Sequence, residues 1–284
     1  MGKSIYAYYP GCTQETTAKE YNESVISVCS SLGIELKELP GWTCCGASSG
    51  HTTDYWLSHA LAGRNLVIAE KLGMNTAVAC PACYQRLNST LKDFRTEEKL
   101  KNRLPSLIGQ PFEARFGVRH ILDIFCNEVG YDAIRSKVVK PLSGLKAVAY
   151  YGCYLVRPPA LTGFDDTENP QTMDNLLRVL GTDVQDWRGK VACCGGSHSF
   201  TLSRAVKDMV SDIIAAAREV EAEAIVTACP LCQVNLESRQ SGKNKLHIFY
   251  FTELVGLAIG LDSKHWFNRH LINPVKLLEK YTLI

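Results

Sequence analysis

Short apolar runs and longer amphipathic stretches alternate along most of the chain. Residues 4–9, 34–39 and 76–79 have the length and side-chain content of buried strands. Between them, residues 18–32 and 53–72 carry apolar positions three and four apart, which is the spacing of one helix face. Strands that alternate with helices in this way predict an α/β fold with mainly parallel strands.

The same order of elements returns in the second half of the chain. The expected elements there are strands at 145–151, 182–185 and 224–228 and helices at 171–180 and 202–220. In each half a Cys-Pro pair follows a predicted strand, and a helix is expected to begin there because Pro is well tolerated in a first turn. Residues 137–144 read as a linker. We therefore predict two tandem domains, residues 1–140 and 141–284, each a small mainly parallel sheet with flanking helices, the second carrying a C-terminal tail.

Composition narrows the class of protein. The 284 residues, 46% of them hydrophobic, suffice for two cores. The net charge of +2 shows no basic excess, which disfavours a nucleic-acid partner. The most apolar segment, residues 254–261, is too short to cross a bilayer, so no transmembrane segment is expected. The N-terminus lacks the long apolar run of a signal peptide, and we expect a cytoplasmic protein.

Twelve cysteines stand out against this composition. Disulfide scaffolds are usually small and secreted, whereas a large chain without a secretion signal favours free thiolates as ligands. Ten cysteines form two sets with the same internal order: a lone Cys, an adjacent pair before Gly, and Cys-Pro-x-Cys. The sets are Cys12, Cys44, Cys45, Cys80 and Cys83, and Cys153, Cys193, Cys194, Cys229 and Cys232.

The two sets indicate an internal duplication. Cys44 and Cys193 are 149 residues apart, as are the later members of each set, while the lone cysteines are 141 residues apart. Flanking residues repeat as well, and we also match His120-Ile121 with His247-Ile248. Cys29 and Cys126 have no counterparts and are expected to be buried as small hydrophobic residues.

Three kinds of site compete for these thiols. A structural zinc ion usually takes four ligands from two separated C-x₂-C knuckles, and each set has only one. Adjacent cysteines also diverge, so they suit different metal atoms of a larger body. A dithiol redox enzyme would use the two C-P-x-C motifs and leave six repeated cysteines without a role.

An iron–sulfur cluster explains more of the pattern. Thiolates hold such clusters, and Cys followed by Pro occurs in their loops. Glycine beside the ligands lets the backbone approach a bulky core, where its N–H groups can donate to sulfur. The glycines concerned are Gly11, Gly46, Gly152, Gly195 and Gly196. A fifth cysteine in each set hints at an unusual cluster, but spacing alone leaves its type open.

The order Cys, Cys-Cys-Gly, Cys-Pro-x-Cys resembles the cysteine-rich CCG domain. Two copies in one chain resemble the B subunit of heterodisulfide reductase, over about residues 4–260. Residues 150–158 (YYGCYLVRP) and 164–170 (FDDTENP) share this likeness. The resemblance implies two noncubane [4Fe–4S] clusters, one on all five cysteines of each set.

The resemblance also implies a reaction and partners. The two clusters of that family face each other across a pocket and cleave a small disulfide, such as the mixed disulfide of coenzymes M and B. Electrons come from a ferredoxin-like C subunit, which a flavin-containing A subunit supplies. This chain has no Gly-x-Gly-x-x-Gly fingerprint for a flavin of its own, so it should depend on such partners.

Three further residues are candidates for catalysis. His51 and His198 follow the two Cys-Cys-Gly elements and could protonate a leaving thiolate, although a histidine there more often only hydrogen-bonds its loop. Arg157 could bind an anionic substrate group, but a surface salt bridge is the commoner use.

An electron-relay protein that never meets a disulfide would need the same cysteines. An open pocket with cationic groups would favour catalysis, and bulky side chains between the two sets would favour relay. The sequence leaves this choice, and the identity of the disulfide, open.

Overall fold

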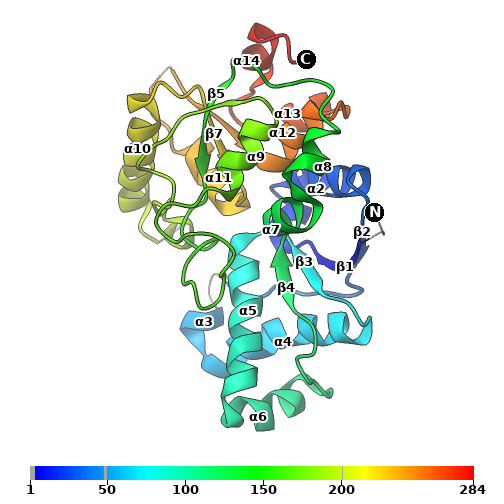
Figure 1. Cartoon of the computed structure of the whole chain (residues 1–284). Helices are drawn as coiled ribbons and strands as arrows, with labels where there is room; N and C mark the ends of the chain where they lie inside the picture. The colour runs from blue at the N-terminus through cyan, green and yellow to red at the C-terminus, as the bar shows by residue number, and fades with distance from the viewer. Residues whose placement is uncertain (1–3, 48–49, 200, 243) are drawn as a thin grey trace.

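The first half of the chain forms one parallel sheet with flanking helices (Figure 1). The computed structural model describes residues 4–47, 50–199, 201–242 and 244–284. The strand order is β2-β1-β3-β4. The elements are β1 (Ser4–Tyr9), α1 (Cys12–Glu15), α2 (Lys19–Ser31), β2 (Ile34–Glu38), α3 (Gly50–Thr53), α4 (Tyr55–Lys71), β3 (Thr76–Val78), α5 (Pro81–Thr96), α6 (Glu98–Ile108), β4 (Val118–His120), α7 (Ile121–Asp123), the π-helix η1 (Ile124–Gly130) and α8 (Tyr131–Arg135).

The second half repeats this architecture. Its parallel sheet has the strand order β6-β5-β7-β8. The elements are β5 (Lys146–Tyr150), α9 (Thr172–Val179), β6 (Asp183–Val184), the 3₁₀ turn η2 (Gly196–His198), α10 (Ser203–Glu219), β7 (Ala224–Thr227), α11 (Pro230–Ser238), β8 (His247–Tyr250), α12 (Phe251–Ala258), α13 (Lys264–Phe267) and α14 (Val275–Lys280). The predicted α/β fold with two parallel sheets is confirmed.

Local sequence signals fix where several helices begin. α5 and α11 start at Pro81 and Pro230, each in the first turn, as the two Cys-Pro pairs predicted. The Asp54 side chain caps α4 by accepting a hydrogen bond from the backbone N–H of Leu57 at 2.7 Å. These signals place the N-termini of α5 and α11 directly after the strands that carry the cysteines.

The strand register corrects one predicted match between the halves. In the first sheet Val78 pairs with His120, and in the second sheet Thr227 pairs with Tyr250. Val78 and Thr227 are 149 residues apart, like the cysteines, so the counterpart of His120 is Tyr250. The predicted match of His120 with His247 is therefore wrong by three residues. Strands this short gave too little pattern to set the register.

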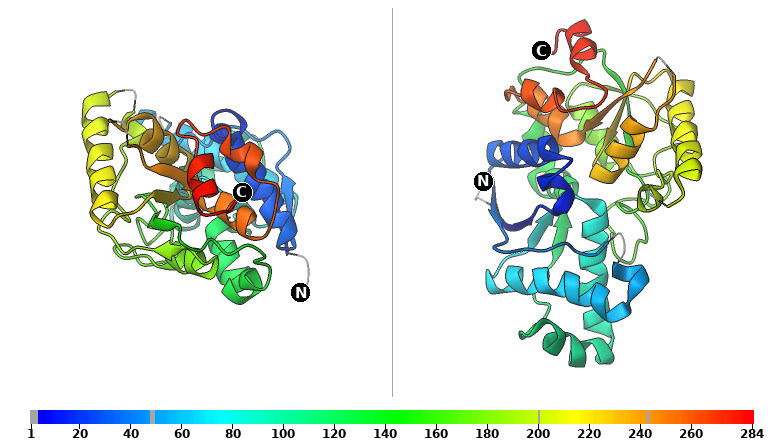
Figure 2. Two further views of the ribbon diagram at one scale, coloured as in Figure 1. Left: turned by 90° about the horizontal axis from the view of Figure 1, so that it is seen from above. Right: turned by 180° about the vertical axis from the view of Figure 1, so that it is seen from behind.

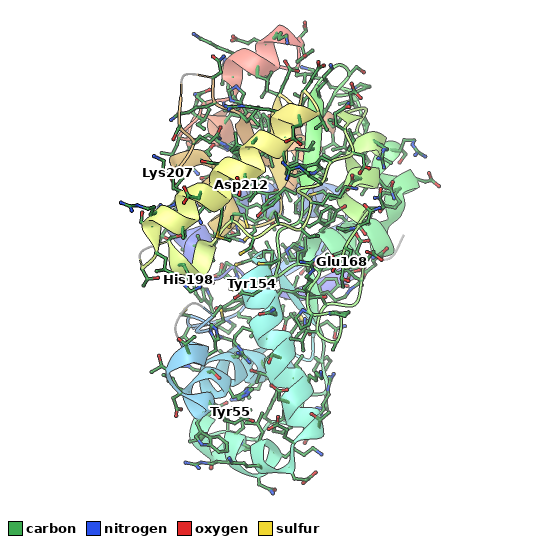
Figure 3. All side chains as sticks on the ribbon, turned by 90° about the vertical axis from the view of Figure 1, so that its left-hand side faces the viewer. Tyr55, Tyr154, Glu168, His198, Lys207 and Asp212 are labelled. Carbon is green, nitrogen blue, oxygen red and sulfur yellow. The ribbon has the colours of Figure 1, made fainter. Side chains whose placement is uncertain are left out.

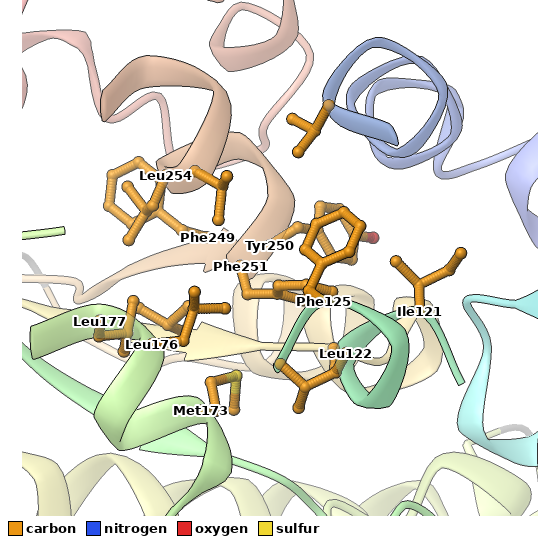
Figure 4. Packing of buried hydrophobic residues seen from close by; sticks show 14 of the residues in the cluster. Ile121, Leu122, Phe125, Met173, Leu176, Leu177, Phe249, Tyr250, Phe251 and Leu254 are labelled. Carbon is orange, nitrogen blue, oxygen red and sulfur yellow. The ribbon is translucent and has the colours of Figure 1, made fainter. Parts of the chain in front are cut away.

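The two halves share a hydrophobic core. Helix α2 of the first half lies against α12 of the second half, and the Ser24 and Thr252 hydroxyls are 2.7 Å apart. Figure 2 shows α2 beside the C-terminal helices, and Figure 4 shows side chains of η1, α9, β8 and α12 packed together. The domain boundary at residue 140 stays a prediction, and a core that joins both halves must fold with both present.

The C-terminal tail packs back onto the body. Trp266 and Phe267 are fully buried, and Leu278 and Leu283 join the shared core, whereas Leu271 is 70% exposed. The sequence left open whether this tail covers its own chain or a partner, and most of its apolar residues cover its own chain. Among the described residues, no helix has the length and apolar character needed to cross a membrane.

A buried histidine anchors this tail between two glutamates. His270 Nδ1 lies 3.0 Å from Glu237 on α11, and His270 Nε2 lies 2.8 Å from Glu253 on α12. Burial lowers the pKa of His270, but the charges and hydrogen bonds of Glu253 and Glu237 outweigh burial and raise it well above its ordinary value. The protonated imidazole thus ties the tail to both helices.

Candidate functional site

The ten repeated cysteines gather at the carboxyl ends of the strands. Cys12 begins the helix after β1, and Cys80 follows β3, which lies next to β1 in the sheet. Cys153 and Cys229 hold the same places after β5 and β7. The adjacent pairs lie in the loops after β2 and β6. This edge is where parallel α/β sheets usually place their sites.

The thiols of each set lie in contact with one another. The sulfur atoms of Cys45 and Cys83 are 3.3 Å apart, and those of their counterparts Cys194 and Cys232 are 3.4 Å apart. The Cys153 sulfur lies 3.8 Å from the Cys193 sulfur. The structure therefore brings each predicted set together, although the members span some 70 to 80 positions of sequence.

The adjacent cysteines face different surroundings. Cys44 and Cys193 are exposed, whereas the following residues, Cys45 and Cys194, are buried. Each set therefore has three buried thiols and an open side formed by its lone cysteine and the first member of its pair. This divergence is what different metal atoms of one cluster require.

Hydrogen bonds among the thiols shift their pKa values in equivalent ways. The pKa of Cys44 falls to about 2, first because the Cys12 thiol donates to it. Likewise the pKa of Cys193 falls to about 6, first because the Cys153 thiol donates to it. The donors Cys12 and Cys153 have raised pKa values for the same reason. Both sets thus favour a thiolate on their open side.

Glycines bring the backbone close to the sulfurs, as the sequence predicted. The N–H of Gly46 donates to the Cys44 sulfur at 3.4 Å, and the N–H of Gly195 donates to the Cys193 sulfur at 3.3 Å. A Cβ atom on Gly152, where φ is +67°, would lie 3.2 Å from the Cys232 sulfur. The loops can therefore carry only glycine without crowding the thiols.

Within the described ranges, no three His, Cys, Asp or Glu side chains are arranged to hold a single metal ion. Two features of the donor sets suit a multi-iron cluster. Each set offers five soft thiols, and the members of its adjacent pair diverge. The glycine N–H groups aimed at sulfur supply the hydrogen bonds that cluster ligands usually receive.

A cavity of about 130 Å³ opens beside the second set. All five cysteines of that set line it, together with His198, Tyr151, Tyr154, Leu231 and, from the first half, Pro81. Its walls are mainly apolar, and its volume is several times that of a water molecule. Figure 3 shows Tyr154 and His198 at the junction of the two halves. Of the predicted catalytic residues, His198 lines this cavity.

His51 and Arg157 lie elsewhere. His51 is exposed and lines a small cavity of about 20 Å³ beside the first set, together with Arg86 and Tyr154. Arg157 donates to the Glu168 carboxylate at 2.6 Å and to the carbonyl of Thr167 at 2.9 Å. The alternative of a surface salt bridge is therefore confirmed for Arg157.

Tyr154 and Leu231 were not predicted as site residues. Both pack against the core of the first half while they line the cavity of the second. Bulky side chains thus stand between the two cysteine sets. Their only sequence signal was nearness to Cys153 and Cys232, which does not show which way a side chain points.

Arg86 was also missed. It occupies the position that Asn235 holds in the second half, because the two are 149 residues apart like the cysteines. The Arg86 guanidinium donates to Ser89 at 2.7 Å, while its buried Nε has no partner among the described residues. Asn235 instead donates to the carbonyl of Cys194 at 3.0 Å. A charge therefore distinguishes the first site from the second, and comparing the repeats could have revealed it.

A buried ion pair supports the loop that carries Cys153. The Lys190 ammonium is 3.0 Å from the Asp174 carboxylate, which is fully buried, and the Lys190 carbonyl accepts hydrogen bonds from the N–H groups of Tyr151 and Gly152. The Tyr151 hydroxyl donates to the same Asp174 carboxylate at 2.7 Å. Lys190 therefore holds the loop that leads into Cys153 from two sides.

The sequence profile of the cysteine-rich domain, CCG, matches this chain twice, at residues 6–88 and 147–237. The chain belongs to the CCG family. Each CCG match contains one of the two five-cysteine sets described above. The two matches also agree with the two parallel sheets, so the predicted duplication and the predicted family are confirmed.

Relatives within the CCG family are components of oxidoreductases. The chain is 30% identical over 283 residues to the 8-methylmenaquinol:fumarate reductase membrane anchor subunit of Wolinella succinogenes, covering 96% of this chain and 98% of that one. It is 28% identical over 256 residues to the B subunit of a CoB-CoM heterodisulfide reductase of Methanosarcina acetivorans, covering 84% of each chain. This CCG protein is thus a heterodisulfide reductase-like subunit, related also to a fumarate reductase subunit.

The fold recurs in a solved structure of much lower identity. A hypothetical protein from Helicobacter pylori superposes with a TM-score of 0.72 at 8% identity, covering 94% of this chain. The present chain spans about half, 51%, of that longer chain. At this identity the likeness concerns the fold alone.

Proposed function

We propose that this CCG protein is the iron–sulfur subunit of a heterodisulfide reductase-like complex, with one noncubane [4Fe–4S] cluster on each five-cysteine set. It reduces a small disulfide with electrons from a ferredoxin-like subunit and a flavin-containing subunit. The relatives named as B subunits of heterodisulfide reductases support this proposal. The observation that carries it is the apolar cavity against the second cysteine set, which contains His198.

Disulfide cleavage consumes two electrons and two protons and yields two thiols. A bound cluster would supply electrons and an iron atom able to accept a substrate sulfur. The residues of the chain do the rest: Tyr151, Tyr154 and Leu231 exclude water from the cavity beside the second set. His198 is placed at the cavity wall to give a proton to one leaving thiolate.

The proposal is tested on anaerobically purified protein with electron paramagnetic resonance. Adding an excess of a small disulfide to the reduced protein should change the signal of one cluster. His198→Asn should keep the iron content and slow disulfide cleavage by about 10²-fold or more, the usual contribution of a general acid. Exposed His265→Asn is the control and should change neither. A full iron content with no response to any disulfide would refute the disulfide-reductase assignment.

A second candidate is electron relay in a complex without a disulfide substrate. Two observations favour it: the relative named for 8-methylmenaquinol:fumarate reductase matches nearly end to end, and Tyr154 and Leu231 fill space between the two sets. In this case the cavity would be part of the route to a partner. Full iron and fast reoxidation by an acceptor complex, with no effect of His198→Asn, would support relay.

A further inference from the structure

One buried hydroxyl touches both cysteine loops. Tyr21 on α2 is fully buried, and its hydroxyl lies 3.0 Å from the carbonyl oxygen of Ala79 and 3.0 Å from that of Ala228. Each carbonyl belongs to the residue just before a Cys-Pro-x-Cys motif, and the two alanines are 149 residues apart. The hydroxyl therefore sits where the two repeats meet and shares its proton between equivalent acceptors.

Only the first half supplies such a residue. Helices α2 and α9 end 148 residues apart, at Ser31 and Val179. The same shift carries Tyr21 to Asn169, which precedes α9 because α9 begins only at Thr172. The tyrosine thus lies in an extra first turn of α2, and this turn reaches across to the second repeat.

Neighbouring polar groups hold Tyr21 in place. Its ring stacks on Tyr250 with centroids 4.0 Å apart and an interplanar angle of 2°. The Tyr250 hydroxyl lies 3.4 Å from the side-chain oxygen of Gln233, the residue after Cys232. On the other side, His120 Nε2 lies 2.8 Å from the same Ala79 carbonyl. The contacts form a continuous buried link from one motif to the other.

We propose that Tyr21 is a positioning residue that couples the two cluster sites, fixing the Cys80 and Cys229 loops to each other and carrying their electronic contact through its hydroxyl. The coupling rests on the proposed function, because it requires a cluster on each set. From either ligand cysteine, the route to Tyr21 crosses one peptide bond and one hydrogen bond.

The step that this link serves is one-electron exchange between the two sites. One site is oxidised as the other is reduced, and Tyr21 keeps its proton and all its electrons. A disulfide needs two electrons delivered at one cavity, while a donor supplies them singly. Rapid exchange between the sites would let the second electron reach the cavity before a half-reduced product leaves.

The mechanical half of the proposal is tested by amide hydrogen exchange on Tyr21→Phe, which keeps the ring and its stacking. The Tyr84 amide reports on the first loop because it donates to the Cys80 carbonyl, and the Gln233 amide reports on the second because it donates to that of Cys229. A hydrogen bond worth about 0.5–1.5 kcal/mol corresponds to about 2- to 13-fold faster exchange. We expect both amides to accelerate by such a factor.

Tyr131→Phe is the matched control, because the Tyr131 hydroxyl also donates to a backbone carbonyl, that of Thr172, away from the cysteines. It should leave both reporter amides unchanged. Unchanged exchange at both reporters in Tyr21→Phe, or acceleration of the Tyr84 amide alone, would overturn the bridge.

The electronic half is read from freeze-quenched paramagnetic resonance after a dose of reductant that supplies one electron per chain. In Tyr21→Phe, iron content should match that of the unmodified chain, and redistribution of the electron between the two signals should slow at least threefold. An unchanged rate would overturn the electronic role. Absence of clusters from the unmodified chain would instead refute the proposed function, and the hydrogen-exchange result would still decide the bridge.

Discussion

Replacing Gly152 by Ala tests whether the cysteine loops need glycine because of the thiols. Gly152 has φ +67°, and its Cβ would lie 3.2 Å from the Cys232 sulfur and 3.7 Å from Tyr150. A left-handed backbone costs a non-glycine residue about 1–2 kcal/mol. At about 2–4 °C per kcal/mol for a chain of this size, the melting temperature should fall by about 2–8 °C. In addition, Cys232 must move by a few tenths of an ångström.

Gly130→Ala separates the crowding of the thiol from the backbone strain. Gly130 has φ +85°, and nothing lies within 4 Å of its Cβ position. It should therefore lose a similar melting temperature, measured by circular dichroism, without touching a cysteine. We expect Gly152→Ala alone to lose iron from the second set or to shift the reduction potential of that cluster. Equal iron content and equal potentials in the two variants would refute the argument that the thiol sets the need for glycine.

Three further changes probe the supports of the site. His270→Gln should remove a pH-dependent part of the stability: a raised folded pKa stabilises fully below about pH 6.5 and is lost as the pH rises through that folded pKa, so urea unfolding of the unmodified chain should weaken with rising pH and the variant should not follow. Lys190→Met leaves the buried Asp174 carboxylate without its ion pair and should cost about 3–5 kcal/mol in urea unfolding, with loss of iron from the second set. Arg157→Gln breaks only the exposed pair with Glu168 and should cost at most about 1 kcal/mol with full iron content, and a larger loss of either would show that Arg157 serves the site.

The sequence was sufficient for the fold and for the grouping of the cysteines. Alternating periodicities indicated the parallel sheets, and the 149-residue spacing matched Cys44 with Cys193. The divergence of the adjacent cysteines also followed from local geometry, since neighbouring side chains point in different directions. These features depend on residues close in sequence or on the repeat itself.

Contacts between the halves could not be predicted in this way. Tyr21 lies in an ordinary amphipathic helix pattern, and nothing nearby in sequence shows that its hydroxyl meets Ala228, 207 positions away. The strand pairing that equates His120 with Tyr250 rests on runs of three and four residues, too short to show a period. Such features are set by packing across the shared core, which no local pattern records.

The central claim is that each five-cysteine set holds one four-iron cluster. Iron and acid-labile sulfide, measured on anaerobically purified protein, test it most directly. The account predicts about eight irons and about eight sulfides per chain. It also predicts about half of each after Cys44→Ser/Cys45→Ser and again after Cys193→Ser/Cys194→Ser. Zinc near stoichiometry with little iron or sulfide, after anaerobic reconstitution, would contradict it.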